Sequence, residues 1–457
     1  MKRHRLAHLL AAAALACSSG AGLAGGLTIQ ATSVALHPFV HEVGDLGFPP
    51  TTAFCLLNLH RHCYQPFQLV KAYDLAPLHN AGIDGRGETI VIVDSFGSPT
   101  IAHDLHLFDT TFGIPDPPSF QIRQDAGPVP PFSTTAFNGD EVSWAAETSL
   151  DVEWSHVFAP GANIILEETP VDETEGVQGF PEIVRAENFA IDHLNPAVIS
   201  QSFGATEETF PNNQAILNLR SSFVNAKSNH VTVLGSSGDL GATDFESNLS
   251  DIYPFAVNSW PSSDPLVMSI GGTMLTLDDN GNHIQPDVVW NDGFGAGGGG
   301  VSAVFGRPGF QARVKGVTGA TRGTPDISLS SACDGAVVYV RTFTPSRAAS
   351  PFGLVCGTSE ASPEFAGIIA MADQVAGRHL GDIHTTLYHM RYGDDGLVDV
   401  TQGNNSFGPF TNSDGTTHTV QGFNALPGYD LASGVGTIDA AAFVPALAHA
   451  GDDGSGG

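Results

Sequence analysis

Short apolar runs alternate with longer amphipathic stretches along most of this chain. Runs rich in β-branched residues, without polar alternation, indicate strands that are buried on both faces. We expect such strands at 89–94, 163–167, 197–202, 231–235, 266–270 and 336–340. Helical stretches lie between them, at 141–157, 181–193, 212–228 and 363–376. This alternation predicts an α/β fold, a doubly wound parallel sheet with helices on both faces.

The two ends of the chain depart from this pattern. Residues 1–24 combine a basic start, a short apolar run and small residues, which is typical of a secretory signal peptide. A lipoprotein cysteine at Cys17 is the alternative interpretation. Residues 25–50 carry no periodicity and indicate a linker or short N-terminal extension, 51–450 indicate one large domain, and 451–457 a disordered tail. We therefore expect a secreted protein, extracellular or periplasmic.

Composition narrows the range of partners. The chain has 18 Lys and Arg against 48 Asp and Glu, a formal net charge of −30, while 42% of its residues are hydrophobic. A chain this acidic is repelled by phosphate backbones and by anionic lipid surfaces. We expect no nucleic-acid partner, no membrane partner and a monomer.

Export also implies an oxidising environment in which cysteines pair. Proximity in the sequence favours Cys55 with Cys63 and Cys333 with Cys356, although four cysteines allow three connectivities. The two histidines between Cys55 and Cys63 raise the alternative of a Cys/His metal site, but no second ligand pair lies at zinc spacing.

One candidate nucleophile stands in the segment Gly357 to Pro363. A glycine turn there puts Ser359 just before an apolar helix, with Ser362 as the expected N-cap and Pro363 as the first helical residue. A hydroxyl in this position lies in the positive field of a helix N-terminus, which favours an anion beside it. Taken alone, these serines are better explained as turn and capping residues.

Candidate acid–base groups stand in two other segments. Glu147 and Asp151 are four residues apart on a predicted helix, so they share a face and can share a proton as a coupled base. Asp239 lies in a Gly-rich turn after a predicted strand, at the edge where open α/β sheets place their sites. A solvated acidic face and an ordinary turn residue are the alternatives.

Together these segments resemble the sedolisin family of serine-carboxyl peptidases, which includes the kumamolisins and the tripeptidyl peptidases. The order is Glu-x-x-x-Asp, then Ser-Gly-Asp-x-Gly, then Gly-Thr-Ser-x-x-Ser-Pro. Further segments match the family in the same order: 73–97, 260–261, 267–275, 290–291, 297–302 and 322–328. Each match is weak alone, but in register they extend over most of the chain.

The resemblance implies a subtilisin-like α/β fold and a sedolisin-like peptidase domain over 51–450. It makes Ser359 the nucleophile, Glu147 the general base, Asp151 its orienting partner and Asp239 the oxyanion stabiliser. A serine hydroxyl needs a positioned base. Because the sequence has no His-Gly dipeptide of the subtilisin type, Asp94, which stands where subtilisins carry their aspartate, has no catalytic argument. The expected function is acid-acting hydrolysis of polypeptides through an acyl-enzyme, by an endopeptidase in preference to a tripeptidyl peptidase.

The resemblance also implies one Ca²⁺ ion near the C-terminus. The family holds this ion with an aspartate, the next carbonyl, a Gly-rich turn and a second aspartate. The matching residues are Asp399, Val400, Leu426, Gly428 and Asp430. Carboxylates and carbonyls are suitable ligands for this hard cation, and Leu426, which replaces a frequent glycine, still offers its carbonyl.

Two departures from the family pattern bear on function. The family is usually made with a long N-terminal propeptide, whereas only some 25–50 residues separate the expected signal peptide from the expected domain here, which leaves folding assistance, latency and activation without the family's usual explanation. Glu360 follows the nucleophile where small residues are common and can perturb the neighbouring carboxyls. A non-catalytic secreted scaffold that retains the fold is the alternative function, and a conventional subtilisin is disfavoured by the missing histidine motif.

Overall fold

The computed structural model describes residues 41–134 and 140–450, and the expected signal peptide and tail lie outside these ranges. The main sheet has eight strands in the order β11-β10-β8-β6-β3-β5-β4, with β14 paired to β10. Only the β10–β11 pairing within it is antiparallel. The strands are β3 (Thr89–Ser95), β4 (Phe120–Arg123), β5 (Asn163–Thr169), β6 (Val198–Gln201), β8 (Thr232–Ser236), β10 (Met268–Met274), β11 (Val288–Val289) and β14 (Ile327–Ser330).

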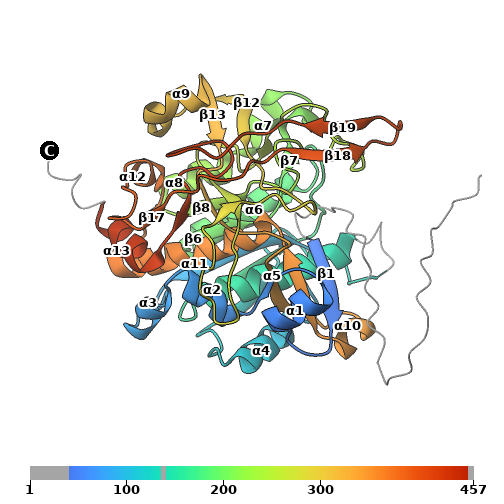
Figure 1. Ribbon diagram of the computed structural model, residues 1–457, viewed down its shortest axis with the longest axis vertical. Helices are drawn as coiled ribbons and strands as arrows, with labels where there is room; N and C mark the ends of the chain where they lie inside the picture. Colours follow the sequence, from blue (N-terminus) through green and yellow to red (C-terminus); the bar gives the residue numbers. More distant parts are fainter. Residues whose placement is uncertain (1–40, 135–139, 451–457) are drawn as a thin grey trace, which may run out of the picture.

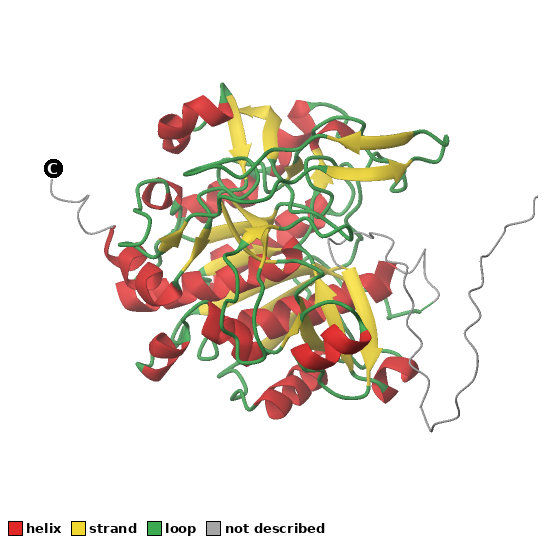
Figure 2. Cartoon of the chain, viewed as in Figure 1, coloured by secondary structure: helices red, strands yellow, loops and turns green. Residues whose placement is uncertain are grey.

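Helices cover both faces of this sheet, as expected (Figures 1 and 2). On one face α11 (Thr358–Ala376) crosses β3, β6, β8, β10 and β14 and packs against α5 (Asp140–Phe158). On the other face lie α6 (Phe180–Leu194) and α8 (Ser221–Ser228). Strand β3 serves both cores, since Ile90 and Ile92 belong to the cluster of α11, whereas Val91 and Val93 belong to that of α6. An apolar run without polar alternation is what this two-sided burial requires.

Smaller sheets surround this centre. A four-stranded sheet has the order β1 (His41–Leu46), β16 (Phe352–Cys356), β15 (Ala336–Val340) and β2 (Cys63–Tyr64). The two-stranded sheets are β12 (Gly300–Gly306) with β13 (Thr321–Thr324), β17 (Leu397–Val398) with β20 (Thr437–Ile438), β18 (Phe407–Thr411) with β19 (Thr417–Val420), and β7 (Ala205–Thr206) with β9 (Ser259–Trp260). The remaining helices are α1 (Thr52–Asn58), α2 (Pro66–Ala72), α3 (Ala76–Asn80), α4 (Ile101–Phe112), α7 (Asn213–Leu219), α9 (Lys315–Thr318), α10 (Pro345–Ala349), α12 (His384–Leu387) and α13 (Ala440–Ala450), with 3₁₀ turns η2 (Glu207–Thr209) and η3 (Gly309–Val314).

The structure differs from the sequence-based expectation in several elements. The expected helix 212–228 is two helices, α7 and α8, with Arg220 between them. The expected strand 336–340 exists, but it belongs to the four-stranded sheet. Most importantly, the expected linker 25–50 contains β1, which pairs antiparallel with β16 (Figure 1). A strand this short has no internal periodicity to detect, because its pairing partner lies some 300 residues away in the sequence.

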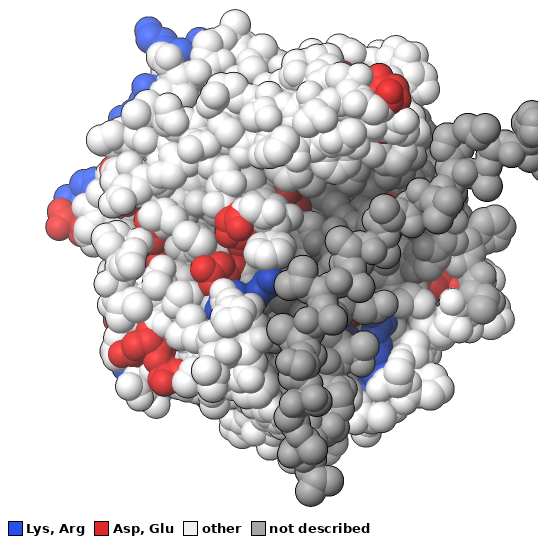
Figure 3. Space-filling view, turned by 45° about the vertical axis from the view of Figure 1, so that its right-hand side comes forward, with Lys and Arg blue, Asp and Glu red and all other residues white. Residues whose placement is uncertain are grey.

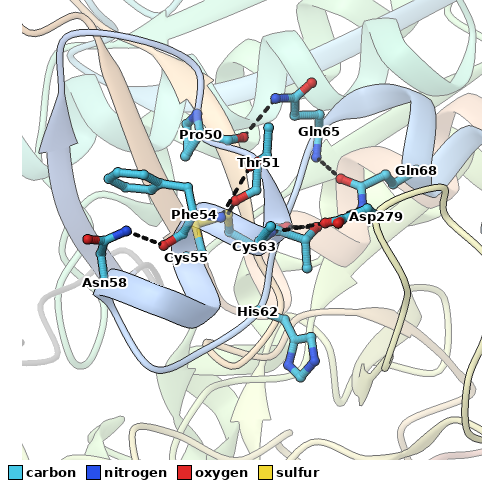
Figure 4. Close-up of a disulfide and its surroundings, with 12 residues drawn as sticks. Pro50, Thr51, Phe54, Cys55, Asn58, His62, Cys63, Gln65, Gln68 and Asp279 are labelled. Carbon is cyan, nitrogen blue, oxygen red and sulfur yellow. Dashed lines mark hydrogen bonds between the residues drawn. A yellow bond between two sulfur atoms is a disulfide. The ribbon is translucent and has the colours of Figure 1, made fainter.

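Both disulfides join the cysteines expected from proximity. Cys55 pairs with Cys63 and Cys333 with Cys356. Figure 4 shows the first of them, between α1 and the start of β2, with the ring of His62 directed away from the sulfur atoms. His62 Nδ1 instead contacts Asp334 Oδ1 at 2.8 Å. The Cys/His metal alternative is therefore wrong, because the Cys63 sulfur is bonded to Cys55.

The visible surface carries few charged side chains, as the low content of charged residues in the chain predicts. On the face shown in Figure 3, acidic side chains lie in separate patches and most of the surface is uncharged. Within the described ranges, no helix has the length and apolarity needed to cross a membrane.

Candidate active site

The backbone that leads to Ser359 runs from β16 directly into α11. Gly357 is the N-cap residue, with φ of 137°, a conformation that favours glycine. The helix begins at Thr358, so Ser359 occupies its second position and is completely buried. The expectation that Ser362 caps the helix and Pro363 opens it is wrong, because the helix starts several residues earlier.

Pro363 lies inside the helix and affects the nucleophile segment. Proline has no amide hydrogen, so it cannot donate to the carbonyl four residues earlier, which is that of Ser359. The Ser202 hydroxyl, just after β6, lies 3.4 Å from this carbonyl oxygen. Ser202 also donates to Asp151 Oδ1 at 3.0 Å, and Ser359 Oγ lies 3.5 Å from the Ser202 carbonyl oxygen. Ser202 thus connects the nucleophile segment to the acid–base pair, a role that no sequence motif indicated.

Glu147 and Asp151 lie on one face of α5, directed at the start of α11. Both are completely buried, which raises the pKa of each carboxyl well above its ordinary value. A hydrogen bond with the Ser359 hydroxyl lowers the pKa of Glu147 against this larger effect. The approach is loose, since neither Glu147 oxygen has a partner in good hydrogen-bond geometry. Catalytic hydrogen bonds of this kind tighten when substrate binds.

Asp94, the penultimate residue of strand β3, is a third member of this carboxyl group. Burial raises the pKa of Asp94 to about 7, and the charge of Asp94 in turn raises the pKa of both Glu147 and Asp151. Its oxygens have no partner in good hydrogen-bond geometry. The sequence argument that Asp94 has no part in the chemistry is therefore incomplete, because the fold places it beside the predicted base pair.

Asp239 lies on the other side of the Ser359 segment, in the turn after β8. Its Oδ1 accepts hydrogen bonds from the Thr358 amide at 2.8 Å and from the Thr358 hydroxyl at 2.9 Å. Complete burial raises the pKa of Asp239 well above its ordinary value, and the two Thr358 donors oppose this effect. A protonated Asp239 has a hydrogen to donate, so this carboxyl can act as the acid that faces an oxyanion.

The N-terminal strand β1 reaches this side of the site. His41 pairs in register with Cys356, the last residue before Gly357. Its buried ring meets Trp290 edge to face, and its Nε2 lies 3.6 Å from Asp239 Oδ2. No local sequence pattern indicates this contact, since it depends on the long-range pairing of β1 with β16.

A second buried carboxyl pair lies along α11. Glu360 and Glu364 are completely buried, and burial raises the pKa of both. The charge of Asp239 raises the pKa of Glu360, and that of Glu360 raises the pKa of Glu364. The charge of Asp239, on the oxyanion side of Ser359, thus acts on Glu360, whereas Glu360 is not among the causes that raise the pKa of Glu147 and Asp151.

The structure therefore brings together all four predicted catalytic residues. They come from α5, the β8 turn and the start of α11, at the carboxyl edge of the parallel strands. A hydroxyl between a carboxyl base and a carboxylic acid, with water excluded, is an arrangement suited to acyl transfer.

Comparison with known proteins identifies the relatives of this chain, although no protein-family model matches it. It is 28% identical to kumamolisin from Bacillus sp. (strain MN-32) over 383 residues, 82% of this chain and 62% of that protein. It is 30% identical to sedolisin from Pseudomonas sp. (strain 101) over 414 residues, 89% of this chain and 64% of that protein. The chain belongs to the sedolisin family. It spans less than two thirds of the length of these two sedolisin relatives.

The solved structure of Pseudomonas sedolisin, a serine-carboxyl proteinase complexed with two molecules of pseudo-iodotyrostatin, has a similar fold. The TM-score is 0.68 at 26% sequence identity, and the match covers 84% of this chain and 97% of that one. The subtilisin-like α/β fold expected for a sedolisin is thereby confirmed.

The residues implied for a sedolisin calcium site lie together beyond β17. The Gly428 amide donates to both oxygens of Asp399, at 3.2 and 3.0 Å. The Leu426 amide donates to Asp430 Oδ2 at 2.8 Å. Burial has the largest effect on the pKa of Tyr392 and raises it, and the charges of Asp399 and Asp430 raise it further. Both carboxylates therefore lie near the same side chain.

The donor set of this segment is consistent with a hard cation. Asp430 is buried, and burial raises its pKa, while backbone amides and Ser433 donate to it. The Val400 carbonyl is approached by the Ser433 hydroxyl at 3.5 Å, a weak contact that leaves the oxygen free to bind a metal ion. Two carboxylates with nearby carbonyls are ligands that Ca²⁺ accepts.

Proposed function

We propose that this protein is a secreted, acid-acting serine-carboxyl peptidase that hydrolyses polypeptides, with endopeptidase action as its main activity. One observation carries the proposal: the Ser359 segment lies between the Glu147 carboxyl and the Asp239 carboxyl, and all three side chains are completely buried. The membership of the sedolisin family and the two disulfides, which suit an oxidising compartment, support it.

The proposed chemistry assigns one role to each side chain. Ser359 Oγ attacks the peptide carbonyl carbon while Glu147 accepts the hydroxyl proton. Asp151 orients the Glu147 carboxyl and shares a proton with it. The protonated Asp239 donates a hydrogen bond to the developing oxyanion. Glu147 then returns its proton to the leaving amine, and water hydrolyses the acyl-enzyme by the same steps.

We further propose one Ca²⁺ ion bound by Asp399, Asp430 and the carbonyls of Val400, Leu426 and Gly428. When bound, the ion supplies positive charge that holds the 426–433 turn against the end of β17. It lies apart from the catalytic residues and is assigned no step of the reaction.

The decisive experiment compares variants on denatured casein at about pH 4, near the ordinary carboxyl pKa. Ser359→Ala should lower kcat/KM by at least about 10³-fold, and Glu147→Gln by about 10²–10⁴-fold. Ser362→Ala is the matched control, because Ser362 lies on the same helix and contacts Ser200 Oγ at 2.9 Å. Equal background cleavage by wild type and Ser359→Ala would leave the scaffold interpretation in place.

Product analysis separates the two kinds of peptidase. An endopeptidase cleaves a long peptide with an acetylated N-terminus, whereas a tripeptidyl peptidase requires the free amine and releases successive tripeptides. Mass spectrometry of both peptide forms distinguishes them.

A further inference from the structure

A second group of chemically active side chains lies at the opposite edge of the sheet from Ser359. Glu88 immediately precedes β3, Asp373 lies in the last turns of α11, and His379 follows the end of that helix. Each offers one ligand atom, and these atoms all lie within 4.8 Å of one another. The catalytic residues lie at the start of α11, so the helix separates the two groups by almost its whole length.

Asp373 is the least satisfied member of this group. Its side chain is 0% exposed. Oδ1 accepts a hydrogen bond from the Leu380 amide at 2.9 Å, whereas Oδ2 has no hydrogen-bond partner. A buried carboxylate oxygen without a partner is unfavourable unless a proton or a cation compensates it. Either a proton or a bound cation can therefore compensate this oxygen.

The spacing of the other two members suits a small divalent ion. His379 Nε2 lies 3.2 Å from Glu88 Oε2. Zinc binds nitrogen and oxygen ligands at about 2.0–2.2 Å in a tetrahedron, whose edges are then roughly 3.4 Å. A metal ion could thus bind both atoms with little rearrangement, and it would replace the ion pair that they form without it.

Charged side chains and a cavity open to solvent surround this cluster. Burial has the largest effect on the pKa of Asp373 and raises it, the charge of Glu88 raises it further, and the charge of Arg378 lowers it. A cavity of about 410 Å³, lined by Asn195, Asn229, His230, Arg378 and His379, reaches the histidine from solvent. An ion has a route of entry, and Arg378 lies in the wall of that route.

We propose that Glu88, Asp373 and His379 form a binding site for one divalent transition-metal ion, with Zn²⁺ as the best-matched ion. One imidazole and two carboxylates are ligands of the kind that zinc and its neighbours select, whereas Ca²⁺ prefers oxygen ligands alone. Water completes the coordination. The ion fastens the end of α11 to the start of β3, and so stabilises the helix that carries Ser359 at its other end.

The test uses the full secreted protein carrying Ser359→Ala, so that its outcome does not depend on peptidase activity or on self-cleavage. Zn²⁺ is titrated calorimetrically at about pH 7.5, where an ordinary imidazole is neutral, with saturating Ca²⁺ to fill the other proposed site. We expect one Zn²⁺ per chain and a raised melting temperature. His379→Gln and Asp373→Asn should each weaken zinc binding by at least about tenfold, since even indirect supports of metal sites cost that much.

His389→Gln is the matched control, because His389 is an exposed histidine near α12 whose Nδ1 lies 2.7 Å from the Thr385 carbonyl oxygen. It should bind zinc like the parent protein. If Asp373→Asn fails to fold, the variant His379→Gln still tests the site, because His379 is only half-buried. Binding of Co²⁺, followed by its visible absorption, is a second measurement. Visible absorption of bound Co²⁺ should be present in the parent and absent in His379→Gln. No stoichiometric Zn²⁺ binding, or equal binding by His379→Gln and the parent, overturns the proposal.

Discussion

His41 Nε2 lies 3.6 Å from Asp239 Oδ2, so the N-terminal strand of this protein ends against the carboxyl that we propose to face the oxyanion. The contact rests on the antiparallel pairing of β1 with β16, which leads directly into the Ser359 helix. Other β1 contacts are ionic: Glu42 pairs with Arg341 and Arg347. The segment that precedes the peptidase domain in sequence thus forms one wall of its candidate site.

Release of β1 in acid is the first prediction. Burial lowers the pKa of His41 to about 4, while the Asp292 carboxylate opposes this effect. A free histidine titrates near 6.5, so His41 supports docking above that pH and loses this support as the pH falls toward about 4. The loss amounts to about 3 kcal/mol at most. Glu42, whose pKa lies below its ordinary value, adds to the loss only at lower pH.

Amide hydrogen exchange of residues 41–46 in the Ser359→Ala protein measures this release. After correction for intrinsic rates, exchange should be about 100-fold faster at pH 4 than at pH 7, as that free energy requires. His41→Leu, which does not titrate, should remove most of the difference, and the exposed His106→Gln should not. Equal protection at both pH values contradicts the prediction.

Asp239→Asn should flatten the fall of kcat/KM toward neutral pH. The amide keeps an oxygen for the two Thr358 donors and has an N–H at every pH. An ionised Asp239 about 3 Å from the oxyanion would repel it by roughly 5 kcal/mol at an effective dielectric of 20, or three to four decades of rate. Because burial raises the pKa of Asp239, the wild-type rate should begin to fall above pH 3.9, the ordinary aspartate pKa.

The measurement is a pH–rate profile of both proteins, with the exposed Asp394→Asn as the control. A wild-type optimum near pH 8 would remove this role from Asp239. So would an Asn variant with full activity and an unchanged profile.

The folded protein should be more stable at pH 4 than at pH 7. Burial raises the pKa of Asp239, Glu360 and Glu364. Such groups stay protonated when folded but ionise near pH 4 when unfolded, so their contribution is full below that pH and is lost as the pH rises. Each group lowers the free energy of unfolding by about 1.4 kcal/mol per pH unit over that interval.

Denaturant unfolding of Ser359→Ala at constant saturating Ca²⁺ tests this direction. Replacing Glu364 with Gln should reduce the slope by the contribution of about one group, whereas the exposed Asp394→Asn should leave it unchanged. A free energy of unfolding that rises from pH 4 to pH 7 would show that ordinary ion pairs outweigh the buried carboxyls.

Removal of calcium at neutral pH should lower the melting temperature. A ligand present at 100 times its dissociation constant adds about 2.7 kcal/mol. Asp430→Ala should abolish the response to a chelator. Its baseline should also fall, because the Leu426, Ala432 and Ser433 amides lose their acceptor. The response to the chelator is therefore the readout. A melting curve that is unchanged by chelation in both wild type and Asp430→Ala excludes the site.

Local sequence patterns predicted the elements whose formation depends on neighbouring residues in the chain. The buried strand 89–94 and the helix carrying Glu147 were predictable because burial on both faces and helical spacing leave direct patterns in the sequence. The start of α11 was misjudged, because Ser-Pro is a common helix opening and only the packed sheet shows that Thr358 is already helical. The contacts of His41 and Ser202 depend on long-range pairing, which a single sequence does not encode visibly.

Asp94 provides the last prediction, because its role depends on charge and not on contact with substrate. Its charge raises the pKa of both Glu147 and Asp151. Burial raises the pKa of Asp94 to about 7, so Asp94 is neutral in acid and carries its charge only near and above neutral pH. Asp94→Asn preserves the shape of the neutral acid, so the acid limb of kcat/KM should stay at the wild-type position. Glu168→Gln is the control, since Glu168 pairs in register with Asp94 and acts on the dyad only through it. An acid limb that moves down in Asp94→Asn but not in Glu168→Gln would contradict this prediction, because it would mean that Asp94 is ionised in acid and that its charge sets the proton affinity of the dyad.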